Sequence, residues 1–185
     1  MNTPNKLTIL RVLLIPAICV LIALREYLGA AVCFAAAALT DFLDGMIARR
    51  CNQITVFGKF LDPVADKLLV LTAMIMLCGQ GMLPAWAVAV VAARELAVDG
   101  LRLVANSSGT VVAAKLPGKI KTTLQLLCVL SALLLGKHLA TDILTAAMAA
   151  MTVFSGALYF RELWKYVWKP EECPKRALKF SSFFS

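Results

Sequence analysis

Apolar residues occupy long, nearly uninterrupted runs along this chain, and short polar or charged segments separate the runs. Each run approaches the length of about 20 residues that a helix needs to cross the hydrocarbon core of a bilayer. We therefore predict an all-α integral membrane protein with six transmembrane helices. The predicted spans cover residues 9–24, 28–49, 61–78, 83–104, 119–135 and 143–160.

The positive charges lie mainly in the segments between these runs. If the first, third and fifth connections face outward, only Arg25 and Lys137 of the 19 Lys and Arg residues lie on that side. Because basic loops are retained in the cytoplasm, both termini are predicted to be cytoplasmic. Ahead of the first span, Thr3 and Pro4 begin a pattern typical of a short amphipathic helix that lies at the cytoplasmic interface.

The composition excludes several other classes of protein. Hydrophobic residues make up 61% of the 185 residues, compared with roughly 45–50% in soluble domains. The net charge of +8 is spread over the connections, so nucleic acid is not an expected partner. The six cysteines form no CxxC pair, so neither a disulfide framework nor a zinc site is predicted. We expect residues 1–185 to form a single membrane domain with a basic interfacial tail from about residue 161.

Four of the six aspartates lie at the facing ends of two consecutive predicted helices. Asp41 and Asp44 are three residues apart and Asp62 and Asp66 are four apart, so at about 100° per residue each pair shares one helix face. Each carboxylate costs about 2.5–3.5 kcal/mol at the centre of a membrane helix.

The nearby basic residues Arg49 and Lys67 are too few to neutralise these four carboxylates. Two divalent cations would balance the charge, and a ligand set made only of oxygen favours Mg²⁺ or Mn²⁺. The alternative is that the carboxylates cap helix ends or pair with basic loop residues.

The segment that follows Asp44 combines small residues with a cation. Gly45 and Ala48 leave the backbone open to a bulky ligand, and the guanidinium of Arg49 suits a phosphate group. Small residues in membrane helices also serve helix packing, which is the alternative explanation. Next to the aspartates, the pattern favours a phosphate-containing ligand.

The chain contains Asp41-x2-Asp44-Gly45-x2-Ala48-Arg49-x8-Gly58-x3-Asp62-x3-Asp66. This motif resembles, at every defined position, the signature of the CDP-alcohol phosphotransferase family. The resemblance implies a six-helix, usually dimeric membrane enzyme that uses two divalent cations and displaces CMP from a CDP-linked donor with an alcohol. It also implies that all four aspartates are metal ligands and that Asp66 is in addition the general base. The residues that it implies as contacts to CDP are Asn2, Thr3, Pro4, Asn5, Gly45, Ala48, Arg49, Thr55 and Gly58.

The fourth predicted span is unusually polar, because it contains Arg94, Glu95, Asp99 and Arg102. Charges inside a membrane mark a functional site by default, and a salt-bridge network that only fixes helix packing is the alternative. Basic residues continue into the fifth span. We expect a group of cations to surround the phosphate of an anionic acceptor, namely Arg94, Arg102, Lys115, Lys119 and Lys121.

Four segments also resemble one branch of the family. They are Arg94-Glu95, Gly118-Lys119-Ile120-Lys121-Thr122, Pro4-Asn5-Lys6-Leu7-Thr8-Ile9-Leu10-Arg11 and Lys59-Phe60-Leu61-Asp62-Pro63-Val64-Ala65-Asp66-Lys67. That branch uses CDP-diacylglycerol as donor and sn-glycerol 3-phosphate as acceptor. The resemblance implies a homodimeric enzyme of phospholipid biosynthesis in the bacterial cytoplasmic (inner) membrane, with its active site facing the cytoplasm and phosphatidylglycerophosphate and CMP as products.

Two alternatives stay open. The first keeps the chemistry and changes the acceptor to inositol phosphate or phosphatidylglycerol. The second is a small cation transporter that uses the carboxylates as an ion path. A transporter needs polar residues across the full depth of the membrane, whereas the four aspartates cluster near one surface. That asymmetry favours the enzyme.

Overall fold

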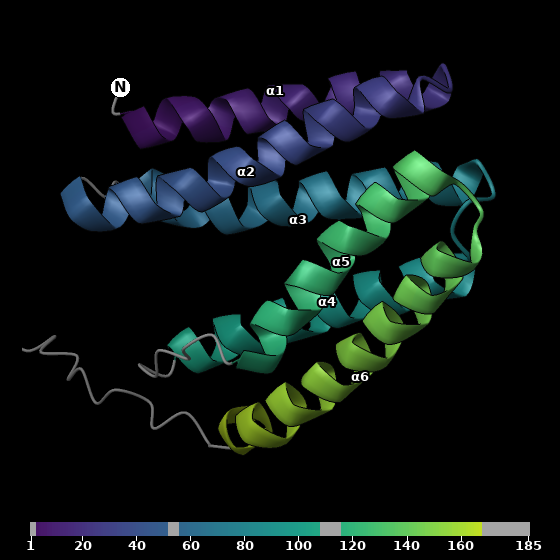
Figure 1. Ribbon diagram of the computed structural model, residues 1–185. Helices are drawn as coiled ribbons and strands as arrows, with labels where there is room; N and C mark the ends of the chain where they lie inside the picture. The colour runs from purple at the N-terminus through teal and green to yellow at the C-terminus, as the bar shows by residue number, and fades with distance from the viewer. Residues whose placement is uncertain (1–2, 52–55, 108–115, 168–185) are drawn as a thin grey trace, which may run out of the picture.

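The computed structural model describes the backbone of residues 3–51, 56–107 and 116–167 and the side chains of residues 11–40, 64–104, 116–162 and 164. Over these residues the fold contains six α-helices and no strand, as predicted (Figure 1). The helices are α1 (Thr3–Ala23), α2 (Tyr27–Cys51), α3 (Val56–Gly79), α4 (Ala85–Ser107), α5 (Leu116–Leu135) and α6 (Leu139–Val167).

The first helix differs from its prediction. Instead of a short interfacial helix followed by a span, α1 runs without a break from Thr3 to Ala23 and contains Pro16. The expected separate amphipathic helix is therefore wrong. The physical reason lies at Arg11, whose side chain is only 2% exposed and is turned into the protein, so this residue does not mark a polar face that rests on the membrane surface.

Three connections are tight turns at one end of the molecule (Figure 1). Each contains a residue with a positive φ angle, namely Arg25 (64°), Gly81 (73°) and Gly136 (63°). The N–H of Glu26 donates to the carbonyl of Leu21 at 2.9 Å, which satisfies an acceptor at the end of α1. The first, third and fifth predicted connections are thus short turns on the same side.

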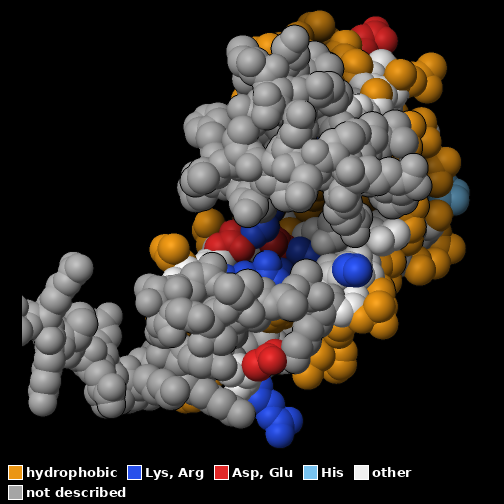
Figure 2. Space-filling model, turned by 90° about the vertical axis from the view of Figure 1, so that its left-hand side faces the viewer, with side chains coloured by type: hydrophobic (Ala, Val, Ile, Leu, Met, Phe, Trp, Pro, Cys, Tyr) orange, Lys and Arg blue, Asp and Glu red, His pale blue; other side chains and the backbone are white. Residues whose placement is uncertain are grey.

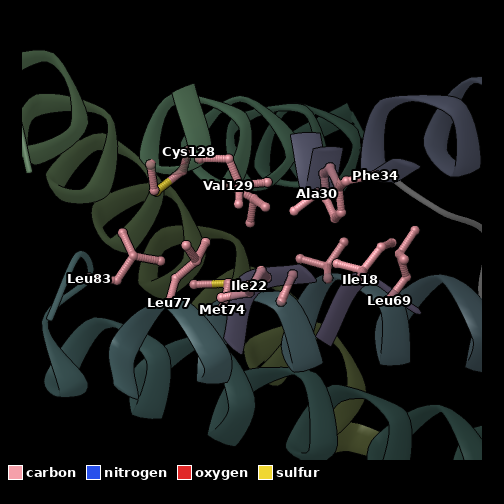
Figure 3. Packing of buried hydrophobic residues seen from close by; sticks show 14 of the residues in the cluster. Ile18, Ile22, Ala30, Phe34, Leu69, Met74, Leu77, Leu83, Cys128 and Val129 are labelled. Carbon is pink, nitrogen blue, oxygen red and sulfur yellow. The ribbon is translucent and has the colours of Figure 1, made fainter. Parts of the chain in front are cut away.

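The helices pack as two groups, which are joined by α5 and by a contact between α3 and α4. α1 lies against α2 and α3, and both α4 and α5 lie against α6, while α5 also crosses α2 and α3 (Figure 1). Figure 3 shows the buried cluster between the groups, in which Phe34, Met74, Leu77 and Val129 are fully covered. Ala30 is fully buried in the same cluster, and a side chain this small lets neighbouring helices approach closely.

Over the described residues, every helix exposes large apolar side chains. Leu13, Leu28, Ile75, Leu103, Leu127 and Ile143 are examples of large hydrophobic side chains that stay exposed. Among the described residues, two helical segments are long and apolar enough to cross a membrane, Leu116–Leu135 and Leu139–Glu162. Shorter apolar helical stretches cover Arg11–Ala23 and Tyr27–Thr40. Such a surface is compatible with a lipid environment.

Candidate functional site

Charged side chains converge at the end of the molecule opposite the three turns. At this end α3 and α5 begin and α4 and α6 end (Figure 1). Figure 2 looks onto it and shows acidic and basic side chains gathered around a hollow. The antiparallel path of consecutive helices thus brings together charges that lie far apart in the sequence.

Asp66, in the first half of α3, is the one predicted metal ligand whose side chain the structure describes. The Nη1 atom of Arg11 donates to Oδ1 of Asp66 at 2.7 Å. The Arg11 side chain is 2% exposed, whereas that of Asp66 is 40% exposed and lines a cavity of about 240 Å³. The carboxylate therefore contacts a buried cation on one side and the cavity on the other.

Sequence reasoning considered only Arg49 and Lys67 as cations near the aspartates and missed Arg11. The signal was present, because Arg11 is a charged residue inside the first apolar run. Charges in such runs usually face a partner within the protein.

The other predicted ligands are placed only by their backbone. Asp41 and Asp44 lie toward the end of α2, Asp62 lies near the start of α3, and four residues connect the two helices. The side chains of these three aspartates fall outside the described residues, and the described side chains alone contain no group of three or more His, Cys, Asp or Glu that could hold a metal ion. The open carboxylate of Asp66 is a hard oxygen donor and fits Mg²⁺ or Mn²⁺.

The residues expected to contact CDP are likewise known from the backbone alone. Thr3, Pro4 and Asn5 open α1, and the others with a described backbone lie near the end of α2 or the start of α3, namely Gly45, Ala48, Arg49 and Gly58. Asn2 and Thr55 lie outside the described residues.

A second cavity, of about 170 Å³, is strongly cationic. Five basic and two acidic side chains line it, namely Lys67, Arg94, Arg102, Lys119, Lys121, Glu95 and Asp99. These charges leave a surplus of three positive charges in a small space. A doubly charged phosphomonoester is the kind of ligand that such a surplus would hold.

Glu95 organises the basic residues of this cavity. Its carboxylate is buried and accepts a hydrogen bond from Lys121. Its Oε2 atom also lies 3.4 Å from Nη1 of Arg94 and 3.9 Å from Nζ of Lys67. Lys67 in turn donates to Asp99. The salt-bridge network considered from the sequence is therefore present, and it forms a wall of the cavity.

Arg102 is held by an aromatic residue of α6. Its Nη2 atom donates to the hydroxyl of Tyr159 at 3.0 Å, and its guanidinium carbon lies 4.9 Å from the ring centroid. The guanidinium of Arg94 lies 5.5 Å from the same ring and donates to Ser155 at 3.2 Å. Within the part of the chain described, Arg102 contacts no carboxylate, so its charge is available to a ligand.

The structure brings four of the five cations expected around the acceptor phosphate into one cavity. These are Arg94, Arg102, Lys119 and Lys121, whereas Lys115 lies outside the described residues. The lining of this cavity also contains Lys67 and Tyr159, which the sequence analysis did not include in the acceptor site. Lys67 was considered only as a counterion for the aspartates. Tyr159 lies inside the last predicted apolar span, where an aromatic residue is ordinary, so it gave no distinct signal.

The two cavities share a wall, because Lys67, Glu95, Lys121 and Thr122 line both. The carboxylate of Asp66 therefore lies on one side of a charged partition and the surplus of positive charge on the other. This arrangement can hold an anionic group beside a group that accepts a proton.

Comparison with known proteins then identifies the family. The family model for CDP-alcohol phosphatidyltransferase matches residues 1–157. The chain belongs to the CDP-alcohol phosphatidyltransferase family. The match extends from α1 through most of α6 and includes all four aspartates and every basic residue of the second cavity.

Three similar proteins from bacteria cover most of the chain. A Bacillus subtilis protein is 41% identical and a Rickettsia felis protein 37% identical; each alignment covers 89% of this chain, with 96% and 97% of the relatives, respectively. Both are named CDP-diacylglycerol–glycerol-3-phosphate 3-phosphatidyltransferase. A Mycobacterium tuberculosis relative, named a probable phosphatidylglycerophosphate synthase, is 38% identical over 85% of this chain and 79% of its own length.

Proposed function

We propose that this member of the CDP-alcohol phosphatidyltransferase family transfers the phosphatidyl group of CDP-diacylglycerol to sn-glycerol 3-phosphate. The products are phosphatidylglycerophosphate and CMP. The observation that carries the proposal is the cationic cavity beside Asp66, because its surplus of three positive charges suits an acceptor that itself bears a phosphate. The names of relatives that align over most of the chain support the same substrates.

The reaction forms a bond between an acceptor hydroxyl oxygen and the phosphorus of the phosphatidyl group. The bond from that phosphorus to the bridging oxygen breaks, and CMP leaves with the bonding electrons. Asp66 takes the proton of the hydroxyl, and Arg11 holds the carboxylate from its buried side. Arg102 and Lys119 bind the acceptor phosphate and orient the hydroxyl toward Asp66.

The donor diphosphate is negatively charged and needs cations close to it. The four aspartates are suited to bind such cations. Asp41, Asp44, Asp62 and Asp66 would hold two divalent cations, Mg²⁺ or Mn²⁺. Bound there, these ions would supply charge stabilisation for the diphosphate and for the departing CMP. The residues that contact the CDP portion in this proposal are Asn2, Thr3, Pro4, Asn5, Gly45, Ala48, Arg49, Thr55 and Gly58.

The proposal includes a location. The chain forms one membrane domain with six transmembrane helices in the bacterial inner membrane, and both termini and the active site face the cytoplasm. The distribution of basic residues supports this orientation, since two of 19 lie in the connections at the opposite end. We propose a homodimer as the working unit.

Purified protein in detergent micelles tests the reaction directly. It is incubated with CDP-diacylglycerol and with glycerol 3-phosphate, glycerol, inositol phosphate or phosphatidylglycerol, and the lipid product and CMP are measured. We expect phosphatidylglycerophosphate to form when glycerol 3-phosphate is the acceptor. We expect no lipid product with the other three acceptors. A different preferred acceptor would replace the proposed one, and the absence of CMP release with every acceptor would contradict the transferase.

The same assay tests the metal requirement. Excess chelator is expected to abolish turnover, and added Mg²⁺ or Mn²⁺ to restore it. Asp41→Asn and Asp62→Asn are expected to be severely impaired. Full activity in excess chelator would contradict the role given to the four aspartates.

A further inference from the structure

The first cavity, of about 240 Å³, is charged at one end and apolar elsewhere. Asp66, Lys67, Glu95 and Lys121 form the charged end. The walls beyond it are made by Ala38 of α2, Leu69, Val70 and Leu71 of α3, and Leu126 of α5. A fully polar acceptor would find few partners along such walls, whereas a lipid with a polar head matches this change from charged to apolar.

One polar residue interrupts the apolar walls. Gln125 lies one helical turn from Lys121 on α5, lines the cavity and is only 4% exposed. Its carboxamide makes no hydrogen bond to any residue that the structure describes. The residue is nearly buried but lines the cavity, so a molecule inside the cavity can reach its carboxamide. The N–H groups of Gln125 are therefore available to a hydrogen-bond acceptor that occupies the cavity.

We propose that the carboxamide N–H of Gln125 donates a hydrogen bond to an ester carbonyl of the donor lipid. Gln125 would thereby select diacyl lipids over lipids whose chains are joined by ether bonds. This inference rests on the proposed function, because it assumes that the reacting phosphate lies at the charged end of the cavity.

The geometry of α5 supports this choice of partner. Gln125 lies four residues beyond Lys121, which corresponds to about 6 Å along a helix. In a diacylglycerol phosphate, the ester carbonyls are the first polar groups after the phosphate, and only hydrocarbon follows them. The order of charged residues, Gln125 and apolar wall along the cavity matches the order of phosphate, ester and acyl chain.

The chemistry of the ester explains why an amide is suited to this position. An ester carbonyl accepts a hydrogen bond but cannot donate one, and the carboxamide supplies two N–H donors. An ether oxygen is a poorer and differently placed acceptor, so an ether lipid would lose this hydrogen bond. The loss of one neutral hydrogen bond is a modest but measurable means of discrimination between similar donors.

The test compares two donors that differ only in this group. CDP-diacylglycerol and CDP-dialkylglycerol of equal chain length are offered in mixed micelles with saturating glycerol 3-phosphate, and kcat/KM for each donor is measured. We expect the wild-type protein to prefer the ester donor by about three- to tenfold, the range for one neutral hydrogen bond. Gln125→Met is expected to remove this preference by lowering kcat/KM for the ester donor alone.

The matched control is Leu126→Met, which introduces the same side chain at the neighbouring position of the same cavity. It should keep the preference for the ester donor. The comparison of the ester and ether donors with the wild-type protein needs no variant. It therefore tests the proposal even if Gln125→Met does not fold. Transfer from both donors with equal efficiency, or an unchanged preference in Gln125→Met, would overturn the role of Gln125. No transfer from either donor would instead contradict the proposed function.

Discussion

Arg11 of α1 and Asp66 of α3 form an ion pair in which Nη1 and Oδ1 are 2.7 Å apart, although 55 positions separate the two residues in the sequence. The cation is buried and the carboxylate is partly open to a cavity. Because α1 supplies this cation, the first helix makes a direct hydrogen bond to the candidate reaction centre. Changes in α1 should therefore affect catalysis as well as stability.

Arg11→Gln is expected to lower kcat by about 10- to 100-fold. The substitution removes a charge-assisted hydrogen bond to Asp66, worth about 1.5–3 kcal/mol, and each 1.4 kcal/mol corresponds to about a tenfold change in rate. Steady-state kinetics with both substrates provides the measurement. Arg11→Lys should recover part of the loss because it keeps the positive charge.

The control for Arg11 is Lys137→Gln, which removes an exposed cation at the opposite end of the molecule. It should retain wild-type kinetics. A wild-type kcat in Arg11→Gln would show that the ion pair does not position the carboxylate of Asp66.

Arg102→Gln is expected to raise the KM for glycerol 3-phosphate by about one to two decades and to leave the KM for CDP-diacylglycerol nearly unchanged. Arg102 contacts Tyr159 and no described carboxylate, so its charge is available to the acceptor phosphate. Loss of a binding contact that is shared by the ground and transition states appears mainly in KM. Both constants are measured with one substrate varied and the other saturating.

Two further variants calibrate this result. Arg161→Gln removes an exposed cation of α6 and should change neither constant. Arg49→Ala should show the reverse pattern, because its proposed partner is the nucleotide of the donor. If Arg102→Gln behaves like Arg161→Gln, the second cavity does not bind the acceptor phosphate.

Glu95→Gln is expected to destabilise the protein by about 3–5 kcal/mol, because it leaves the buried charge of Lys121 without its partner. The double variant Glu95→Gln/Lys121→Gln should be less destabilised than the sum of the two single variants. Unfolding in detergent micelles, followed by circular dichroism, measures all three. Strictly additive losses would show that the two side chains do not interact.

The proposed orientation predicts a pattern of chemical labelling. In a variant without native cysteines, single cysteines near Gly81 and Lys137 should react in intact cells with a thiol reagent that does not cross the membrane. A cysteine near Asn52 should react only after the membrane is permeabilised. The opposite pattern would place the charged end of the molecule outside the cytoplasm.

The sequence by itself determined the number, order and approximate limits of the helices. Helices depend on hydrogen bonds between residues close in the chain and on unbroken apolar runs, so local sequence carries the information. The turns at Gly81 and Gly136 follow from the same local signals, since glycine readily adopts positive φ angles. The spacing of Asp62 and Asp66 likewise suffices to place both on one face of a single helix, because that face repeats every three to four residues.

Only the tertiary structure decided which partner each charged residue takes. Arg11 pairs with Asp66, Lys67 with Asp99, and Lys121 with Glu95, and each pair joins two different helices. Spacing along one helix cannot show which face of another helix will meet it. That choice depends on how the buried side chains of the described helices pack against one another. The packing places Arg11, a charge in the first apolar run, next to Asp66. It also places Gln125 in the wall of a largely apolar cavity.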